Sequence, residues 1–303
     1  MRRRTVSASD PSASDGSWRV AASARTSVGR QRSDNQDAFG MLHLGSGTSE
    51  SEGDAGEDGW AGFSTSARLD AGDPGCLLVV ADGMGGAAAG EVASRLAVAT
   101  VREVVGSRWS ERRDDGVSPT PDELSEILRA AAVEANDRIH EWSARHSEYR
   151  GMGSTLTALG VVDRSAVVAQ VGDSRAYLFR DGEERQLTED QTMARKLVES
   201  GSLAPEEAEG SSQAHMLLQA LGTEPEVRPS VDTHRLRPDD RLLLCSDGLS
   251  DPLSADEMRE ILRGSPDPER ATEALIERAN ERGGPDNITV LLARVDFGDA
   301  PDS

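Results

Sequence analysis

Aromatic residues are scarce in this chain, and cysteines are scarcer still. Phe, Trp and Tyr make up 3% of the 303 residues, and there are 2 cysteines. Runs of Ala, Val and Leu nevertheless supply apolar surface for the core of one large domain or two small ones. Cys76 and Cys245 both lie in apolar strand-like runs. This favours buried thiols over a disulfide, and it fits a reducing, cytoplasmic compartment.

Basic residues are also in short supply. The chain has 33 Lys and Arg against 54 Asp and Glu, a formal net charge of −21. Nucleic acids and anionic membranes both require a basic surface, so neither is expected as a partner. No apolar run reaches transmembrane length. We expect a monomer.

The first residues lack the apolar segment of a secretory signal. Arg2, Arg3 and Arg4 are followed by polar and small residues, which excludes such a signal. The Arg and Ser content also fits a transit peptide, but Asp10 and Asp15 weigh against it. Residues 1–17 are therefore predicted to be a disordered tail.

Four short acid-bearing segments are present, each where a strand-like run meets a turn. In three of them an apolar run borders the acid, and a carboxylate at the end of a buried strand is costly to desolvate without compensation. No Lys or Arg adjoins Asp82, Asp247 or Asp286, which suggests a shared cation. The segments are Asn35-Gln36-Asp37, Ala81-Asp82-Gly83-Met84-Gly85-Gly86, Ser246-Asp247-Gly248 and Gly284-Pro285-Asp286-Asn287.

The other common metal-ligating residues stand apart from these segments. All 5 histidines fall outside them, and neither cysteine has a partner at ligand spacing. Ligation by oxygen alone indicates a hard ion, Mg²⁺ or Mn²⁺, rather than zinc.

Six motifs together resemble a known family. A single Asp-Gly pair is a common turn and says little, but the ordered set is specific. The order resembles that of the PPM phosphatases, the metal-dependent type 2C serine/threonine protein phosphatases. The residues within the motifs are similar to those of the bacterial branch. The resemblance covers residues from about 20 to about 295, through Gly29-x-x-Arg32-x-x-Asn35-Gln36-Asp37, Asp82-Gly83-Met84-Gly85-Gly86, Gly151-Met152-Gly153-Ser154-Thr155, Gly172-Asp173-Ser174-Arg175, Ser246-Asp247-Gly248-Leu249 and Asp286-Asn287-Ile288-Thr289.

The hydrophobic pattern predicts an α+β layered domain. Thr120, Pro121 and Glu123 form the start of a helix with a capping box. Residues 107–118 are expected to be an exposed polar linker after a helix at 88–105. Strands are expected at 18–26, 37–44, 76–81, 154–162, 166–171, 176–180, 241–245 and 287–295, and further helices at 191–200, 205–209, 254–263 and from 267 to about 283.

The resemblance sharpens this expectation to a four-layer α-β-β-α sandwich with two central antiparallel sheets. The phosphatase domain would span 18–296, followed by a tail at 297–303. Residues 45–75 are rich in Gly, Ser and acidic residues and predict a flexible insertion. Residues 188–222 correspond to a mobile flap over the site.

The resemblance also implies a dinuclear centre. Two divalent ions can share a water, lower its pKa and hold it in line with phosphorus. Asp82 would bridge them, with the Gly83 carbonyl on the first ion. Asp247 and Asp286 would complete the second, and Asp37 would be a ligand or a close anchor. Gln36 stands where many relatives carry Glu, so Asp37 must supply the charge of its segment.

Gly83 and Arg32 also have expected roles at this centre. Glycine at 83 permits an unusual backbone angle and removes a side chain that would crowd the ion. Arg32 suits bidentate capture of the substrate phosphate, the alternative being a solvated loop charge.

Asp173 is expected to bind a weaker third ion, as in bacterial relatives. The alternative is a hairpin turn in which Arg175 pairs locally. The Gly151–Thr155 motif is expected to pack closely near the metals without a chemical role.

Two positions depart from the family. Eukaryotic relatives place a candidate general acid, a histidine, where this chain has Met84, so proton delivery would fall to metal-bound water. The second half of the flap, residues 210–215, differs from relatives, and flap loops tune substrate access.

The sequence therefore predicts an Mg²⁺- or Mn²⁺-dependent phosphatase that acts on phosphoserine and phosphothreonine in proteins and counters a serine/threonine kinase. A phosphoprotein-binding pseudophosphatase and a protein with a structural calcium site are the alternatives. The full set of carboxylates counts against the first, and the absence of an EF-hand-like cluster against the second.

Overall fold

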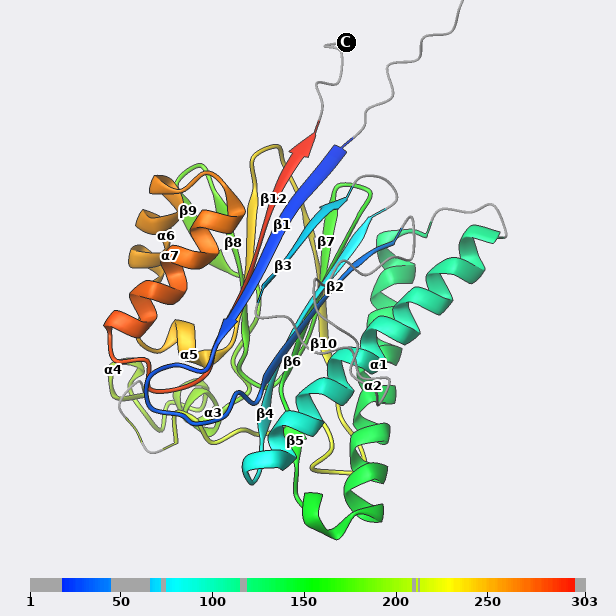
Figure 1. Ribbon diagram of the computed structural model, residues 1–303, viewed down its shortest axis with the longest axis vertical. Helices are drawn as coiled ribbons and strands as arrows, with labels where there is room; N and C mark the ends of the chain where they lie inside the picture. The colour runs from blue at the N-terminus through cyan, green and yellow to red at the C-terminus, as the bar shows by residue number, and fades with distance from the viewer. Residues whose placement is uncertain are drawn as a thin grey trace, which may run out of the picture.

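Two antiparallel sheets form the centre of the molecule, with helices on both outer faces (Figure 1). The computed structural model describes residues 18–44, 66–71, 75–114, 119–208, 211 and 213–297. The predicted tails at 1–17 and 297–303 lie outside these residues, apart from Phe297, which ends β12, and so does most of the predicted insertion. Among the helices of the described part, none is long and apolar enough to cross a lipid bilayer.

The first sheet has six strands, and every neighbouring pair in it is antiparallel. Its order is β3 (Ser66–Ala71), β1 (Trp18–Ser27), β12 (Ile288–Phe297), β11 (Arg241–Cys245), β8 (Arg175–Arg180) and β9 (Glu183–Gln186).

The second sheet is also antiparallel and faces the first. A buried cluster joins the two, with Val20 and Leu291 from the first sheet and Leu78 and Leu159 from the second. The strand order of the second sheet is β10 (Ser230–Arg235), β7 (Ser165–Val171), β6 (Leu156–Val162), β4 (Cys76–Met84) and β2 (Asp37–His43). The short β5 (Gly153–Ser154) pairs with β4.

Each sheet is covered on its outer face by a pair of helices (Figure 1). The second sheet packs against α1 (Ala87–Asp114) and α2 (Pro121–Arg145), and the first against α6 (Ala255–Gly264) and α7 (Pro268–Glu281). Burial on both faces explains why the central strands are continuous apolar runs. The predicted four-layer α-β-β-α architecture is confirmed. The remaining helices are η1 (Ser147–Tyr149), α3 (Met193–Glu199), α4 (Pro205–Ala208) and α5 (Asp247–Ser250).

Local signals set the starts of the outer helices. Thr120 and Glu123 form the predicted capping box of α2, with Pro121 at its first turn. Ser254 and Glu257 do the same for α6. These reciprocal bonds satisfy amide groups that the first helical turn leaves without partners.

Two predictions of irregular structure were wrong for the part of each segment that the structure describes. The linker expected at 107–118 is helical as far as Asp114, because Trp109 is 1% exposed and anchors this end of α1 in the core. The flexible insertion expected at 45–75 contains β3, which pairs with β1 in a register that sets Leu69 opposite Ala22. Leu69 is the only large apolar residue of β3, so pairing with β1 outweighs a weak local signal.

Candidate metal centre and phosphate site

Strand pairing brings the four acid-bearing segments to one end of the two sheets. Asp37 lies opposite Asp82 in the antiparallel pair of β2 and β4. Asp247 begins α5 two residues after the end of β11, and Asp286 lies two residues before β12, which pairs with β11. In Figure 1 the loop after β1 reaches the same end of the molecule as α5. The predicted convergence of the acids is therefore a consequence of sheet register.

The loop that carries Arg32 is fastened by Asn287, a residue without a role in the sequence prediction. The Asn287 amide donates to the carbonyl oxygens of Val28 at 2.9 Å and Asp34 at 2.8 Å, and its Oδ1 accepts from the Gln36 amide at 2.9 Å. Asn287 is 5% exposed. Its position in the Asp286-Asn287 motif was the only signal in the sequence.

Close backbone contact explains the glycine at the start of this loop. Gly29 has φ +80°, and a Cβ there would lie 2.1 Å from the carbonyl oxygen of Asp286. A side chain would therefore clash with the backbone of the acid segment in addition to straining the loop.

Asp37 is a buried carboxylate that accepts hydrogen bonds from the side chains of Ser246 and Thr289. The Ser246 Oγ donates to its Oδ2 at 2.7 Å, whereas its Oδ1 is buried without a hydrogen-bond partner among the described residues. Burial, with further repulsion from Asp247 and Asp286, raises the pKa of Asp37 to about 7 despite the hydrogen bond from Ser246. A bound cation would stabilise a buried carboxylate oxygen that has no hydrogen-bond partner.

Asp82 is fixed through its backbone by the Gly151–Thr155 motif. Its amide donates to Thr155 Oγ1 at 2.9 Å, and its carbonyl accepts from the Thr155 amide at 2.8 Å and from Ser154 Oγ at 3.0 Å. Burial, then repulsion from Asp37 and Asp247, raises the pKa of Asp82 well above its usual value. The expectation that this motif packs beside the acids is confirmed.

Gly83 lacks the unusual backbone angle predicted for it, whereas crowding of an ion by a side chain stays a prediction. It is not among the residues with positive φ, so no unusual backbone angle is involved. A Cβ would instead lie 2.0 Å from the carbonyl oxygen of Gly90 in α1 and 2.7 Å from that of Gln36. Close approach of helix and strand is what excludes a side chain here.

Asp247 and Asp286 complete the acidic group, and Arg32 lies beside it. Burial, then the charges of Asp251 and Asp286, raises the pKa of Asp247 to about 6, and its Oδ1 is buried without a partner among the described residues. Asp286 accepts from Arg32 Nη2 at 2.6 Å, and the Arg32 side chain is 51% exposed. Arg32 is therefore ion-paired at the edge of the acidic group, while half of its side chain remains in solvent.

Asp173 is a further buried acid whose charge interacts with that of Asp247. Burial, then repulsion from Asp247 and Asp190, raises the pKa of Asp173 to about 7. Arg175 pairs with Asp190 through Nε at 3.0 Å and Nη2 at 2.6 Å. The alternative of a hairpin turn with local pairing of Arg175 is therefore wrong, because β7 and β8 lie in different sheets and the guanidinium turns to Asp190 in the flap region.

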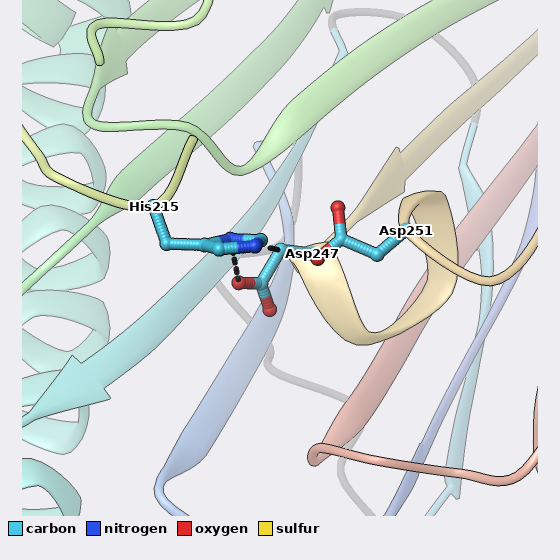
Figure 2. A group of neighbouring side chains, drawn as sticks. All are labelled: His215, Asp247 and Asp251. Carbon is cyan, nitrogen blue, oxygen red and sulfur yellow. Dashed lines mark ion pairs between the residues drawn. The ribbon is translucent and has the colours of Figure 1, made fainter. Parts of the chain in front are cut away.

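Two further residues of the site were missed, Asp251 and His215. Figure 2 shows the His215 ring pointing toward Asp247 at the start of α5 and Asp251 at its C-terminal cap. Its Nδ1 lies 3.9 Å from Asp247 Oδ2 and 3.6 Å from Asp251 Oδ2. Asp251 caps α5 four residues after Asp247. This spacing places two side chains on the same face of a helix, but the short helix α5 was not predicted from the sequence. No local signal linked His215 to these acids.

A cavity of about 1320 Å³ lies between the flap region and these acids. Its lining includes Asp173, Asp247, Asp251 and His215, together with residues of α3. A space of this size next to charged groups can admit a peptide side chain.

The residues present fit divalent cations. Two carboxylate oxygens are buried without partners, and burial with mutual repulsion raises the pKa of Asp37, Asp82 and Asp247 together. Among the described residues, the arginine that forms an ion pair with one of the four acids is Arg32, which contacts Asp286. Added positive charge would remove the repulsion, and an all-oxygen donor set suits Mg²⁺ or Mn²⁺.

Known proteins share this sequence and fold. The family described as Protein phosphatase 2C matches residues 48–291. Protein phosphatase PhpP of Streptococcus pneumoniae is 38% identical over 224 residues, which cover 74% of this chain and 87% of PhpP. Serine/threonine protein phosphatase PstP of Mycobacterium tuberculosis is 41% identical over 225 residues, 73% of this chain and 41% of PstP.

A solved structure agrees with these matches. The catalytic domain of PstP in complex with two manganese ions superposes with a TM-score of 0.70 at 34% identity, covering 92% of this chain and 99% of that domain. The resemblance read from the six motifs is confirmed. This chain belongs to the protein phosphatase 2C family.

Proposed function

We propose that this protein is a metal-dependent phosphatase that hydrolyses phosphoserine and phosphothreonine in proteins. The observation that carries the proposal is the convergence of Asp37, Asp82, Asp247 and Asp286 at one end of the sheets with Arg32 at their edge. Family membership supports the same activity.

Asp82 is the proposed bridge between two Mn²⁺ or Mg²⁺ ions, with the Gly83 carbonyl on the first ion. Asp247 and Asp286 are assigned to the second, and Asp37 supplies charge as a ligand or close anchor. The two ions, when bound, supply a nucleophilic water at neutral pH and neutralise phosphoryl charge. The PstP domain with two manganese ions supports this assignment.

Arg32 is the proposed phosphate-binding residue. Its guanidinium is half exposed and is oriented by Asp286, so its remaining N–H groups are available to phosphoryl oxygens. Asn287 holds the loop that presents it. Met84 is 39% exposed and has no transferable proton, so proton delivery to the leaving alkoxide falls to water at the site.

The wider assignments follow from composition. The proposed phosphatase domain is 18–296, acting as a monomer in the cytoplasm on substrates of a serine/threonine kinase. A net charge of −21 is unfavourable for nucleic-acid or anionic-membrane partners. Residues 188–222, which contain α3 and α4, are the proposed flap and contribute to substrate choice.

One assay tests the proposal against its rivals. We expect turnover of p-nitrophenyl phosphate and of a phosphothreonine peptide with Mn²⁺, and none with EDTA. Binding of the phosphopeptide without hydrolysis would favour the pseudophosphatase. Stabilisation by Ca²⁺ without any turnover would favour a structural calcium site.

A further inference from the structure

The two ends of the flap meet at Gln191. The Leu218 amide donates to the Gln191 carbonyl at 2.8 Å, and Gln219 Nε2 donates to Gln191 Oε1 at 2.8 Å. Residues 192–218, which include α3, therefore form a loop that is closed by Gln191. In Figure 1 α3 lies at the same end of the molecule as α5, which begins with Asp247.

Gln191 also joins this closed loop to the second sheet. Its backbone amide donates to the Gly172 carbonyl at 3.0 Å, and the Gly172 amide donates to Gln191 Oε1 at 2.8 Å. Its Nε2 donates to Ser230 Oγ at 3.0 Å. Gly172 directly follows β7 and Ser230 begins β10, which is paired with β7. One side chain thus connects both ends of the flap loop to two neighbouring strands.

The attachment of the flap lies next to the acidic group. Gly172 directly precedes Asp173, and with φ +99° a Cβ at this glycine would lie 2.8 Å from Cγ2 of Thr155. Thr155 Oγ1 in turn accepts from the Asp82 amide at 2.9 Å. The flap is therefore fixed to the same backbone that holds Asp82, and Gln191 is the residue that makes this connection.

Gln191 is also part of the wall of the cavity between the flap and the acids. Leu218 and Ser230 line the same cavity as Asp173 and Asp247. Leu218 is 43% exposed, and an exposed large apolar side chain offers a contact for a binding partner. Residues next to a phosphothreonine held at the acids would lie in this cavity, whereas p-nitrophenyl phosphate has no such residues. The position of the flap therefore matters most for a peptide.

We propose that Gln191 is a positioning residue that sets the flap over the cavity and thereby determines the affinity for the peptide part of a phosphoprotein substrate. This inference rests on the proposed phosphatase function, and it adds a residue that distinguishes protein substrates from small phosphate esters. Gln191 acts through the flap rather than on the phosphoryl group. When its bonds are lost, the flap spends less time in the position that binds a peptide, and the apparent affinity falls by that fraction.

Kinetics on two substrates test the positioning role. Gln191→Leu keeps most of the side-chain volume and removes the side-chain hydrogen bonds. With Mn²⁺, its KM for a phosphothreonine peptide should rise at least about tenfold, whereas its kcat for p-nitrophenyl phosphate should change less than about twofold. Equal peptide KM values in Gln191→Leu and the wild type would overturn the inference.

The conservative variant Gln191→Glu separates hydrogen bonding from other effects of substitution. A carboxylate can accept from the Gly172 amide and from Gln219, and the Ser230 hydroxyl can turn to donate to it. The peptide KM of Gln191→Glu should therefore stay within about threefold of the wild type. A peptide KM as high as that of Gln191→Leu would overturn the inference.

Gln213→Leu is the matched control, because it makes the same change of side chain elsewhere in the flap. Gln213 contacts α3 through its backbone carbonyl, which accepts from the Ala194 amide at 3.2 Å, and this bond does not depend on the side chain. The peptide KM of Gln213→Leu should equal that of the wild type. A rise as large as in Gln191→Leu would show that the effect is not specific to Gln191 and would overturn the inference.

Hydrogen exchange in the metal-free protein provides a readout that needs no turnover. Amides of α3 and of residues 213–218 should exchange at least about fivefold faster in Gln191→Leu than in the wild type, because the loop loses its side-chain attachment to Gly172 and Ser230. Equal exchange rates would overturn the inference. Absence of hydrolysis by the wild type would instead refute the proposed phosphatase function, and the exchange rates would still decide whether Gln191 holds the flap.

Discussion

Individual acidic side chains at the site are costly to bury, and the same side chains are the proposed metal ligands. Asp82 shows this most clearly, because burial and neighbouring acids raise its pKa while Thr155 holds its backbone in place. Such a group destabilises the metal-free fold unless it is protonated or bound to a cation. Stability is thus given up where the proposed function needs negative charge.

Asp82→Asn is expected to separate these two effects. Loss of the bridging carboxylate should reduce kcat by several orders of magnitude. The Tm in EDTA should rise, because repulsion with Asp37 and Asp247 is relieved. Kinetics with Mn²⁺ and thermal denaturation in EDTA measure the two. A fully active Asp82→Asn protein would refute the bridging role.

Arg32→Ala is expected to weaken phosphate binding. A hydrogen bond to a charged group contributes about 1.5–3 kcal/mol, so kcat/KM for p-nitrophenyl phosphate should fall at least about tenfold. Arg30→Ala is the control, since Arg30 is exposed on the same loop and its amide donates to the Gly284 carbonyl. Similar kinetics in the two variants would place Arg32 outside the site.

At the scale of elements, the site depends on how two loop segments are fastened to strand ends. The loop from Val28 to Gln36 is held by Asn287 at the start of β12 rather than by its own residues. The flap is held by the bridge between Leu221 and Ser154 of β5, and by the Gln191 amide, which donates to the Gly172 carbonyl after β7 at 3.0 Å. Loops positioned by a rigid scaffold are the common location of binding residues.

Asn287→Ala is expected to release the Arg32 loop. Three hydrogen bonds of about 1 kcal/mol each are lost, so both the Tm and kcat/KM should fall. If Asn287 acts through Arg32, the double variant with Arg32→Ala should lose little more kcat/KM than the poorer single variant. Additive losses in kcat/KM would show that Asn287 has no positioning role for Arg32.

At the scale of the whole molecule, the acids link stability to pH and to metal. The pKa values of Asp37 and Asp173 are raised to about 7 and that of Asp247 to about 6, against about 3.9 in an unfolded chain. Between these values the folded protein holds more protons than the unfolded chain. These groups therefore make stability fall as pH rises from about 4 to about 7.

EDTA-treated protein is accordingly expected to have a lower Tm at about pH 7.5 than at about pH 5.5. Added Mn²⁺ should raise the Tm more at the higher pH, because fewer protons compete for the carboxylates. Thermal denaturation at both pH values, with and without Mn²⁺, measures this. An equal Mn²⁺ shift at both would argue against metal binding by the raised-pKa acids.

The sequence by itself determined the family, the layered fold and the acids of the inner site. Apolar strand runs, the capping box at Thr120 and the ordered motifs are local signals, readable without knowledge of distant contacts. Asp82 follows such a run directly and Asp247 follows one after a single serine, so their place at a strand end could be predicted.

Only the tertiary structure decided which distant residues join that site. His215 lies in a segment without periodicity and meets Asp251 through the pairing of the flap with the start of α3. Gly83 is glycine because α1 approaches it, and β3 forms because β1 offers a free edge for pairing. These outcomes depend on contacts between segments far apart in the chain, and local composition carries no record of them.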